Sequence, residues 1–257
     1  MSLKQRSLKF ADAVAPRMFA LSRGLPSYFY GHWLWLDKNC WKTLYLRYEA
    51  DTVRILRENM RNGDTFWDVG ANYGLMSLFA SKLVGDTGHV FSFEPAPESF
   101  KLLQRNTGSS RNISAFSYAV GNQDGTILMS VQGTSTGSSL VKQVVELSQN
   151  YHDGVPIVEV PVSLYRMDTL LNKLSAKPNV IKIDIEGFEV EALRGAQQIL
   201  KEVRPTLIIE IHPLQIEISG SRADEIFDIL KLHRYRHEVY NRDQHWALYS
   251  IVAKPEN

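Results

Sequence analysis

The sequence has little cysteine, no long apolar run and no excess of charge of one sign. Cys40 is the single cysteine in 257 residues, which excludes an internal disulfide and a cysteine-rich zinc site. No apolar stretch approaches the roughly 20 residues that a membrane-spanning helix needs. The net charge of +1 gives no general attraction to nucleic acid or to an acidic membrane. We therefore expect a cytoplasmic protein with no nucleic-acid partner and no stable membrane insertion.

From residue 64 onward, short apolar segments alternate with helical patterns. The apolar segments end near positions 69, 93, 183 and 211, and a helical pattern follows each of them. Nearly continuous apolar strands separated by helices are typical of a parallel sheet that is covered on both faces. Two further segments, at 235–241 and 247–253, are expected to form a closing hairpin that adds an antiparallel strand. The expected fold class is therefore α/β, with one Rossmann-like sheet.

Two regions interrupt this alternation. Residues 1–60 are expected to form an N-terminal extension, with an aromatic strand-like segment at 27–36 and a helix at 47–60. We expect the extension to pack on the core near the substrate site. Residues 61–257 would form the main domain. Within it, an insertion at about 126–162 has the pattern of two strands around a polar loop and would cover the active edge.

The stretch FWDVGANYG places an acid and two glycines between a strand and a helix. Glycine allows a sharp turn and a close approach of a ligand to the backbone after Asp68. The turn lacks the lysine of a phosphate-binding loop and the third glycine of the dinucleotide fingerprint. A carboxylate at this point repels phosphate and favours an amine-bearing ligand. Glu94 ends the next strand, where it can accept hydrogen bonds from ribose hydroxyls. These features predict a nucleoside, and both NAD and S-adenosylmethionine carry one.

Ionisable residues follow two later strands at their carboxyl ends. Asp184, Glu186 and Glu189 end one apolar strand, and Glu210 and His212 end the next. Alternation along a strand places the last two on the same face, so that they can converge. Glu189 lies near the start of the following helix, where the helix dipole favours its charge. The pattern predicts an acid/base or metal site at this edge.

With DVGANYG, FEP, IKIDIEGFE and EIH in this order, the sequence resembles the FkbM-type family of S-adenosylmethionine-dependent methyltransferases. The resemblance runs from about Tyr48 through His212 and more loosely through the closing hairpin. It implies a seven-stranded class I methyltransferase sheet with a C-terminal antiparallel hairpin. It also implies methyl transfer to oxygen, typically a hydroxyl on a sugar, a polyketide or another natural product. S-adenosylmethionine would be the cofactor and S-adenosylhomocysteine the product.

The resemblance also implies roles for individual residues. Those expected to bind the cofactor are Asp68, Gly70, Asn72 and Gly74 around its methionine portion, Glu94 and Pro95 at the ribose, Ser117, Ala119 and Val120 at the adenine, and Asp184 near the sulfonium. The residues expected to act on the acceptor are His212, Asp184, Glu186 and Glu210. His212 is the first choice for general base because its reference pKa lies near neutrality. Glu186 or Glu210 would need a raised pKa for this task.

Some alternatives stay open at this point. No metal is expected, although Asp184, Glu186, Glu210 and His212 together offer donor atoms for a divalent cation. A nicotinamide-dependent oxidoreductase is disfavoured by the missing third glycine and by the acid-rich strand. A non-catalytic nucleoside-binding module is disfavoured because unpaired buried charges cost stability when no ligand is bound. The expected partner is a small-molecule acceptor, and the sequence is compatible with a homo-oligomer.

Overall fold

The computed structural model describes residues 25–29, 32–36, 50–131, 139–140, 142–143, 156–243 and 248–256. The chain forms two compact units, Met1–Ala50 and Asp51–Asn257, so the division falls ahead of the boundary expected at residue 60. In the first unit, β1 (Leu25–Phe29) and β2 (His32–Leu36) pair antiparallel. The expected strand character of the aromatic segment is therefore confirmed.

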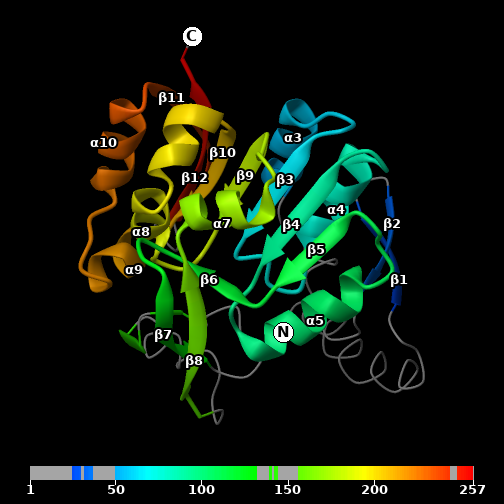
Figure 1. Cartoon of the computed structure of the whole chain (residues 1–257), viewed down its shortest axis with the longest axis horizontal. Coiled ribbons are helices and arrows are strands. Elements are labelled where there is room, and N and C mark those ends of the chain that lie inside the picture. Colours follow the sequence, from blue (N-terminus) through cyan, green and yellow to red (C-terminus); the bar gives the residue numbers. More distant parts are fainter. Residues whose placement is uncertain are drawn as a thin grey trace, which may run out of the picture. The chain divides into compact units, whose positions relative to one another are not determined.

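The second unit is built on a seven-stranded sheet with the order β11-β12-β10-β9-β3-β4-β5 (Figure 1). β12 runs antiparallel to both of its neighbours, whereas β10, β9, β3, β4 and β5 are parallel. This arrangement confirms the expected sheet with its C-terminal hairpin. The strands are β3 (Thr65–Val69), β4 (His89–Phe93), β5 (Ile113–Phe116), β9 (Val180–Ile183), β10 (Thr206–Ile211), β11 (Tyr235–Asp243) and β12 (Leu248–Pro255).

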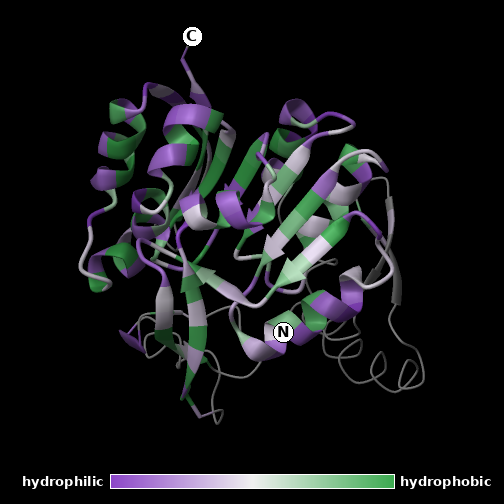
Figure 2. Cartoon of the chain, in the orientation of Figure 1, coloured by the Kyte–Doolittle hydropathy of each residue, from purple (hydrophilic) through white to green (hydrophobic). Residues whose placement is uncertain are grey.

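Helices pack on this sheet and bury their apolar sides. α4 contacts β3 and β4, α5 contacts β5, and α10 contacts both β11 and α8. Figure 2 shows the apolar strands in green and the helices with mixed purple and green sides. The helices are α3 (Ala50–Asn59), α4 (Leu75–Val84), α5 (Pro97–Thr107), α7 (Met167–Leu174), α8 (Glu189–Arg194), α9 (Pro213–Ile218) and α10 (Asp224–Leu232). Within the described residues, no helix is both long and apolar enough to cross a bilayer.

A second sheet of three strands lies beside the carboxyl ends of the parallel strands (Figure 1). Its order is β6 (Tyr118–Val120), β8 (Val158–Tyr165) and β7 (Gly125–Val131). Both strands expected in the region 126–162 are thus present, and they pair antiparallel. The chain leaves the main sheet after β5, and β6 pairs in parallel with β8.

The helical pattern at 189–203 does not form one helix. α8 ends at Arg194, and a π-helical segment, η3 (Ile199–Val203), follows. A Cβ at Gly195 would lie 1.9 Å from the carbonyl oxygen of Gly121, so the chain passes close to another backbone here. The carboxylate of Asp168 accepts hydrogen bonds from the backbone N–H groups of residues 198 and 199. These tertiary contacts explain why the pattern is interrupted.

Candidate functional site

The glycine turn after β3 lies directly against the end of β9. The backbone N–H groups of Gly70 and Ala71 both donate to the carbonyl oxygen of Phe93, at 3.0 Å each. Gly70 has a φ of 82°, and a Cβ at this position would lie 1.8 Å from the backbone oxygen of Asp184. Only glycine therefore fits between the turn and the acid-rich strand. The two groups of residues expected at the cofactor and at the acceptor are joined at this contact.

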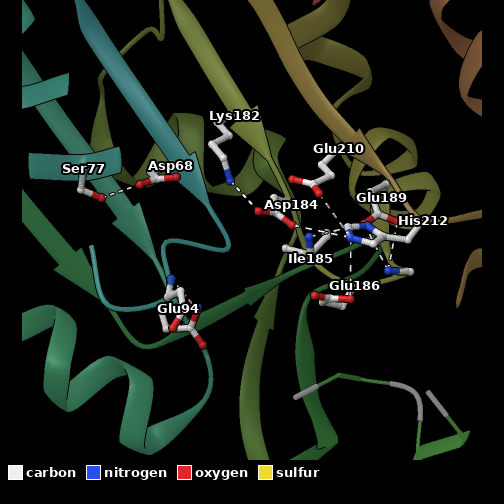
Figure 3. Close-up of polar contacts among 12 residues, drawn as sticks. Asp68, Ser77, Glu94, Lys182, Asp184, Ile185, Glu186, Glu189, Glu210 and His212 are labelled. Atoms are coloured by element: carbon white, nitrogen blue, oxygen red, sulfur yellow. Dashed lines mark hydrogen bonds and ion pairs between the residues drawn. The ribbon is translucent and has the colours of Figure 1, made fainter. Parts of the chain in front are cut away.

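Asp68 is buried below the turn with one oxygen satisfied. Its side chain accepts a hydrogen bond through Oδ2 from Ser77 Oγ at 2.5 Å (Figure 3). Oδ1 is buried and has no hydrogen-bond partner within the described part of the chain. Burial raises the pKa of Asp68, and the nearby Lys182 and the Ser77 hydroxyl oppose this shift. A buried acceptor without a partner fits the amine that the cofactor's methionine portion carries.

Glu94 holds the turn from the end of β4. Its Oε2 accepts a hydrogen bond from the backbone of Asn72 at 2.9 Å, and its Oε1 accepts one from Ala96 at 2.8 Å. Burial raises the pKa of Glu94 to about 7, although these two hydrogen bonds act in the opposite direction. Asn72 has a φ of 50°, so the turn visits the left-handed region at this residue too. Each oxygen of Glu94 retains a further lone pair, which is compatible with the predicted contact to ribose hydroxyls.

The other residues expected at the cofactor lie in different environments. Gly74, with a φ of 87°, directly precedes α4, and Pro95 is partly buried ahead of α5. Ser117 is exposed at the point where the chain passes from one sheet to the other. The side chains of Ala119 and Val120 are buried among apolar residues. Contact between these last two residues and an adenine would therefore be made by their backbone, and their role stays a prediction.

The structure brings the four residues expected at the acceptor together, with three carboxylates around the imidazole of His212 (Figure 3). β9 and β10 are adjacent, so their carboxyl ends meet at one edge of the sheet. His212 Nε2 lies 3.7 Å from Glu186 Oε2 and 4.0 Å from both Asp184 Oδ1 and Glu210 Oε1. Alternation along the strand thus placed Glu210 and His212 as expected. All three separations exceed the length of a direct hydrogen bond.

Glu189 has a role that the sequence did not reveal. Its carboxylate is fully buried, and its Oε1 lies 2.9 Å from His212 Nδ1. The same carboxylate accepts hydrogen bonds from the backbone of Gly187, at 3.1 Å to each oxygen, and at 3.4 Å from Ile185. Glu189 therefore fixes the turn after β9 and orients the imidazole at once. Its position directly after a glycine turn is the sequence feature that points to such a role, whereas the helix dipole explains only why an acid is favoured there.

The turn that follows β9 is strained and presents Glu186. Glu186 has a φ of 53° and Gly187 a φ of 100°. The left-handed region costs a residue other than glycine roughly 1–2 kcal/mol. The side chain of Glu186 keeps 29% of its surface exposed, compared with 4% for His212. Ser139, next to the second sheet, donates to the carbonyl oxygen of Glu186 at 3.1 Å. Strain of this kind gathers at functional sites.

Lys182 is a second residue whose role was missed. It lies in the buried strand β9, opposite Asp68 of β3, and its side chain is 5% exposed. Its Nζ lies 2.7 Å from Asp184 Oδ2. Burial alone would raise the pKa of Asp184, but Lys182 and then His212 hold this pKa below its usual range. A lysine inside an apolar strand, two residues before an acid, was the signal for this pair.

The remaining electrostatics couple the imidazole to its acids. Burial would lower the pKa of His212, but Glu186 and Glu189 outweigh it and raise the pKa well above its ordinary value. Burial raises the pKa of Glu186 to about 7, with His212 opposing and Asp184 supporting the shift. The protein therefore favours the ionised form of Asp184, and it favours the protonated form of Glu186 up to about neutral pH.

The model of the methyltransferase FkbM domain matches residues 68–237. The chain belongs to this family. The hexuronic acid methyltransferase AglP of Haloferax volcanii is 30% identical over 217 residues, which cover 79% of this chain and 81% of that protein. Methyltransferase sdnD of Sordaria araneosa is 25% identical over 202 residues, which cover 67% of this chain and 77% of that protein. The crystal structure of methyltransferase FkbM from Methylobacillus flagellatus has a TM-score of 0.49 and 15% identity, and it aligns with 84% of this chain and 54% of its own.

Family membership decides between the readings that the sequence left open. This FkbM-family chain is an S-adenosylmethionine-dependent methyltransferase, and neither the oxidoreductase nor the non-catalytic module has support. The buried, unpartnered oxygen of Asp68 beside the glycine turn fits the cofactor's amine. The individual roles of the site residues, the oligomeric state and a location in the cytoplasm stay predictions.

Proposed function

We propose that this FkbM methyltransferase methylates a hydroxyl oxygen of a small sugar-type acceptor. The observation that carries the proposal is the contact between the two halves of the site at Gly70. It places the turn expected at the cofactor against the edge where Asp184, Glu186 and Glu210 surround His212. The similarity to a hexuronic acid methyltransferase over 79% of the chain supports a carbohydrate acceptor.

The cofactor side of the site would be held by residues that the chain already positions. Asp68 would accept a hydrogen bond from the cofactor's amine through its unpartnered Oδ1. Glu94 would accept hydrogen bonds from the ribose hydroxyls, while its existing bonds to Asn72 and Ala96 keep the turn in place. When bound, S-adenosylmethionine supplies a methyl group on a sulfonium, and the acceptor oxygen bonds to it as the sulfur–methyl bond breaks.

The acceptor's proton would pass to Glu186. This assignment follows from the exposure of the three carboxylates around the imidazole. The side chain of Glu186 is 29% exposed, compared with 23% for Asp184 and 17% for Glu210. His212, the first choice from the sequence, is 4% exposed and is bound through Nδ1 to Glu189. We therefore place His212 behind Glu186. General-base catalysis needs direct contact with the hydroxyl that loses its proton.

The substrate test is methyl transfer from radiolabelled S-adenosylmethionine to a panel of hexuronic acids and neutral hexoses. We expect labelled product with the uronic acids and little with neutral sugars. Mild alkali distinguishes the modified oxygen, because a methyl ether survives it and a methyl ester is hydrolysed. A label that alkali removes would overturn methylation of a hydroxyl. Binding of S-adenosylhomocysteine without transfer to any carbohydrate would overturn the acceptor class.

Two variants test the division of the site. Asp68→Asn should weaken S-adenosylhomocysteine binding roughly 10- to 100-fold, because a hydrogen bond to a charged group is lost. Glu186→Gln should preserve that binding and lower kcat roughly 100-fold or more, since general-base catalysis contributes that much. The exposed Glu98, which pairs with Lys101 on α5, provides the control variant Glu98→Gln, and neither quantity should change. Loss of cofactor binding in Glu186→Gln would contradict the assignment.

A further inference from the structure

Three donor atoms from the ends of β9 and β10 converge on one point. Asp184 Oδ1, Glu210 Oε1 and His212 Nε2 lie within 4.8 Å of one another. The imidazole nitrogen is 4.0 Å from each of the two oxygens. A divalent ion bound at about 2.1 Å holds neighbouring donors about 3 Å apart and opposed donors about 4.2 Å apart. Side-chain movements of about 1 Å would thus let all three atoms bind one ion.

The orientation of His212 supports a ligand at Nε2. Glu189 is fully buried, and both of its oxygens accept a hydrogen bond from the backbone of Gly187. Nδ1 of the imidazole lies 2.9 Å from the same carboxylate, which can only accept, so Nδ1 is the donor. The Nε2 atom of this buried ring is then turned toward the carboxylates. A histidine that donates one ring N–H to a carboxylate and presents the other nitrogen is the usual form of a metal-binding histidine.

The separations around Nε2 leave room for an ion between the ring and its carboxylates. The other ring nitrogen, Nδ1, lies in direct hydrogen-bonding contact with Glu189 at 2.9 Å. The separations from Nε2 to Asp184, Glu186 and Glu210 are instead 4.0, 3.7 and 4.0 Å. Each of these three side chains points toward the ring in Figure 3, but none lies within hydrogen-bonding distance of Nε2. The spacing is that of donors arranged around a centre between them.

Carboxylates outnumber the basic groups at this edge. Four carboxylates, those of Asp184, Glu186, Glu189 and Glu210, lie within 4.0 Å of the imidazole. Lys182 binds Asp184 through Oδ2, leaving Oδ1 on the side of His212. The uronic acid proposed above would add a further negative charge. Such an acceptor would be repelled unless a cation lay between its oxygens and these carboxylates.

We propose that Asp184, Glu210 and His212 bind a divalent cation of the Mn²⁺ type. Two carboxylate oxygens suit Mg²⁺, Ca²⁺ or Mn²⁺. The imidazole nitrogen favours Mn²⁺ over Mg²⁺ and Ca²⁺, which prefer oxygen ligands. Glu186 stays outside the donor set and remains available to the acceptor. The open coordination positions would take water or, on the basis of the proposed function, two oxygens of the acceptor. The bound ion would then lower the pKa of the hydroxyl to be methylated.

The test is titration of the chelator-treated, full-length protein with MnCl₂, without cofactor or acceptor, followed by calorimetry and electron paramagnetic resonance. We expect a single site in the millimolar range or tighter, with nitrogen modulation from a coordinated imidazole. His212→Gln should abolish this modulation. Glu210→Gln should weaken Mn²⁺ binding roughly 10- to 100-fold. The surface variant Glu98→Gln should bind Mn²⁺ like the unaltered protein.

Binding of S-adenosylhomocysteine to each variant shows that it is folded and separates this proposal from the proposed function. Absence of Mn²⁺ binding in protein that binds the nucleoside would overturn the metal site and leave methyl transfer standing. Unchanged Mn²⁺ affinity in Glu210→Gln would overturn it too, as would methyl transfer that is unaffected by a chelator. Conversely, Mn²⁺ binding in a protein that methylates no carbohydrate would support the metal site and contradict the proposed acceptor.

Discussion

The carboxylates on the two sides of Gly70 differ in how closely their partners approach. On the cofactor side, hydrogen bonds from the chain itself hold Asp68 and Glu94 at 2.5–2.9 Å. On the acceptor side, three carboxylates face His212 Nε2 at 3.7–4.0 Å, too far for direct bonds. On the second side Lys182 holds Asp184 through Oδ2, and the carboxylate oxygens that face His212 leave room for the proposed ligand. The same sheet edge therefore combines carboxylates in close hydrogen bonds with carboxylates spaced around an imidazole.

The largest expected effect comes from breaking the contact between these sides. In Gly70→Ala, the new Cβ would collide with the backbone oxygen of Asp184, and the left-handed φ would be strained as well. Overpacking and backbone strain together should lower the free energy of unfolding by roughly 3–5 kcal/mol. Thermal or denaturant unfolding measures this loss. S-adenosylhomocysteine binding should disappear because the turn can no longer lie against β9.

Gly220 supplies a matched control for that variant. It has a φ of 89°, close to that of Gly70, but its Cβ would meet nothing within 4 Å. Gly220→Ala should therefore cost only the backbone strain, roughly 1–2 kcal/mol, and should leave cofactor binding intact. Equal losses in the two variants would show that the contact between Gly70 and Asp184 has no special weight.

A smaller effect is expected from Lys182, the buried cation that lies between the two sides. Lys182→Met would leave Asp184 without its partner at 2.7 Å and would remove a positive charge near Asp68. Breaking a buried ion pair in this way should cost roughly 2–4 kcal/mol, measured by unfolding. Lys101→Met breaks an exposed pair with Glu98 and should cost less than about 1 kcal/mol.

The double variant of the buried pair decides whether charge is the cause. Adding Asp184→Asn to Lys182→Met removes the uncompensated charge and should recover part of the lost stability. No recovery would mean that Lys182 acts through the packing of its side chain rather than through its charge.

The sequence predicted the parts of the structure that depend on local pattern. Apolar strands with helices between them gave the parallel sheet, and acids at strand ends gave the location of the site. Alternation alone placed Glu210 and His212 on one face. The features that the sequence did not predict depend on partners that are distant in the chain. Gly195 interrupts a helical pattern because of Gly121, and β6 leaves the main sheet because β8 is there to pair with it.

The same limit applies within the site. Glu189 had a satisfactory local explanation, so its hydrogen bond to His212, 23 residues away, could not be inferred. Lys182 was passed over because a lysine in a buried strand has meaning only beside Asp68 of the neighbouring strand. Local chemistry thus predicted which residues lie together at the sheet edge, and tertiary pairing decides how each is held and charged.

The smallest expected effect is the pH dependence of S-adenosylhomocysteine binding through Glu94 on the cofactor side. Burial raises the pKa of Glu94 to about 7, with Asp68 and Asp184 adding to the shift. Ribose hydroxyls donate to the ionised carboxylate, so binding favours loss of the proton, and affinity should rise with pH through this value. The ionised fraction changes about tenfold between pH 6 and pH 8, and S-adenosylhomocysteine should bind about tenfold more weakly at pH 6. Calorimetry across this range measures the slope. Glu94→Gln should bind weakly at every pH, and a slope that survives in this variant would assign the titration to another group.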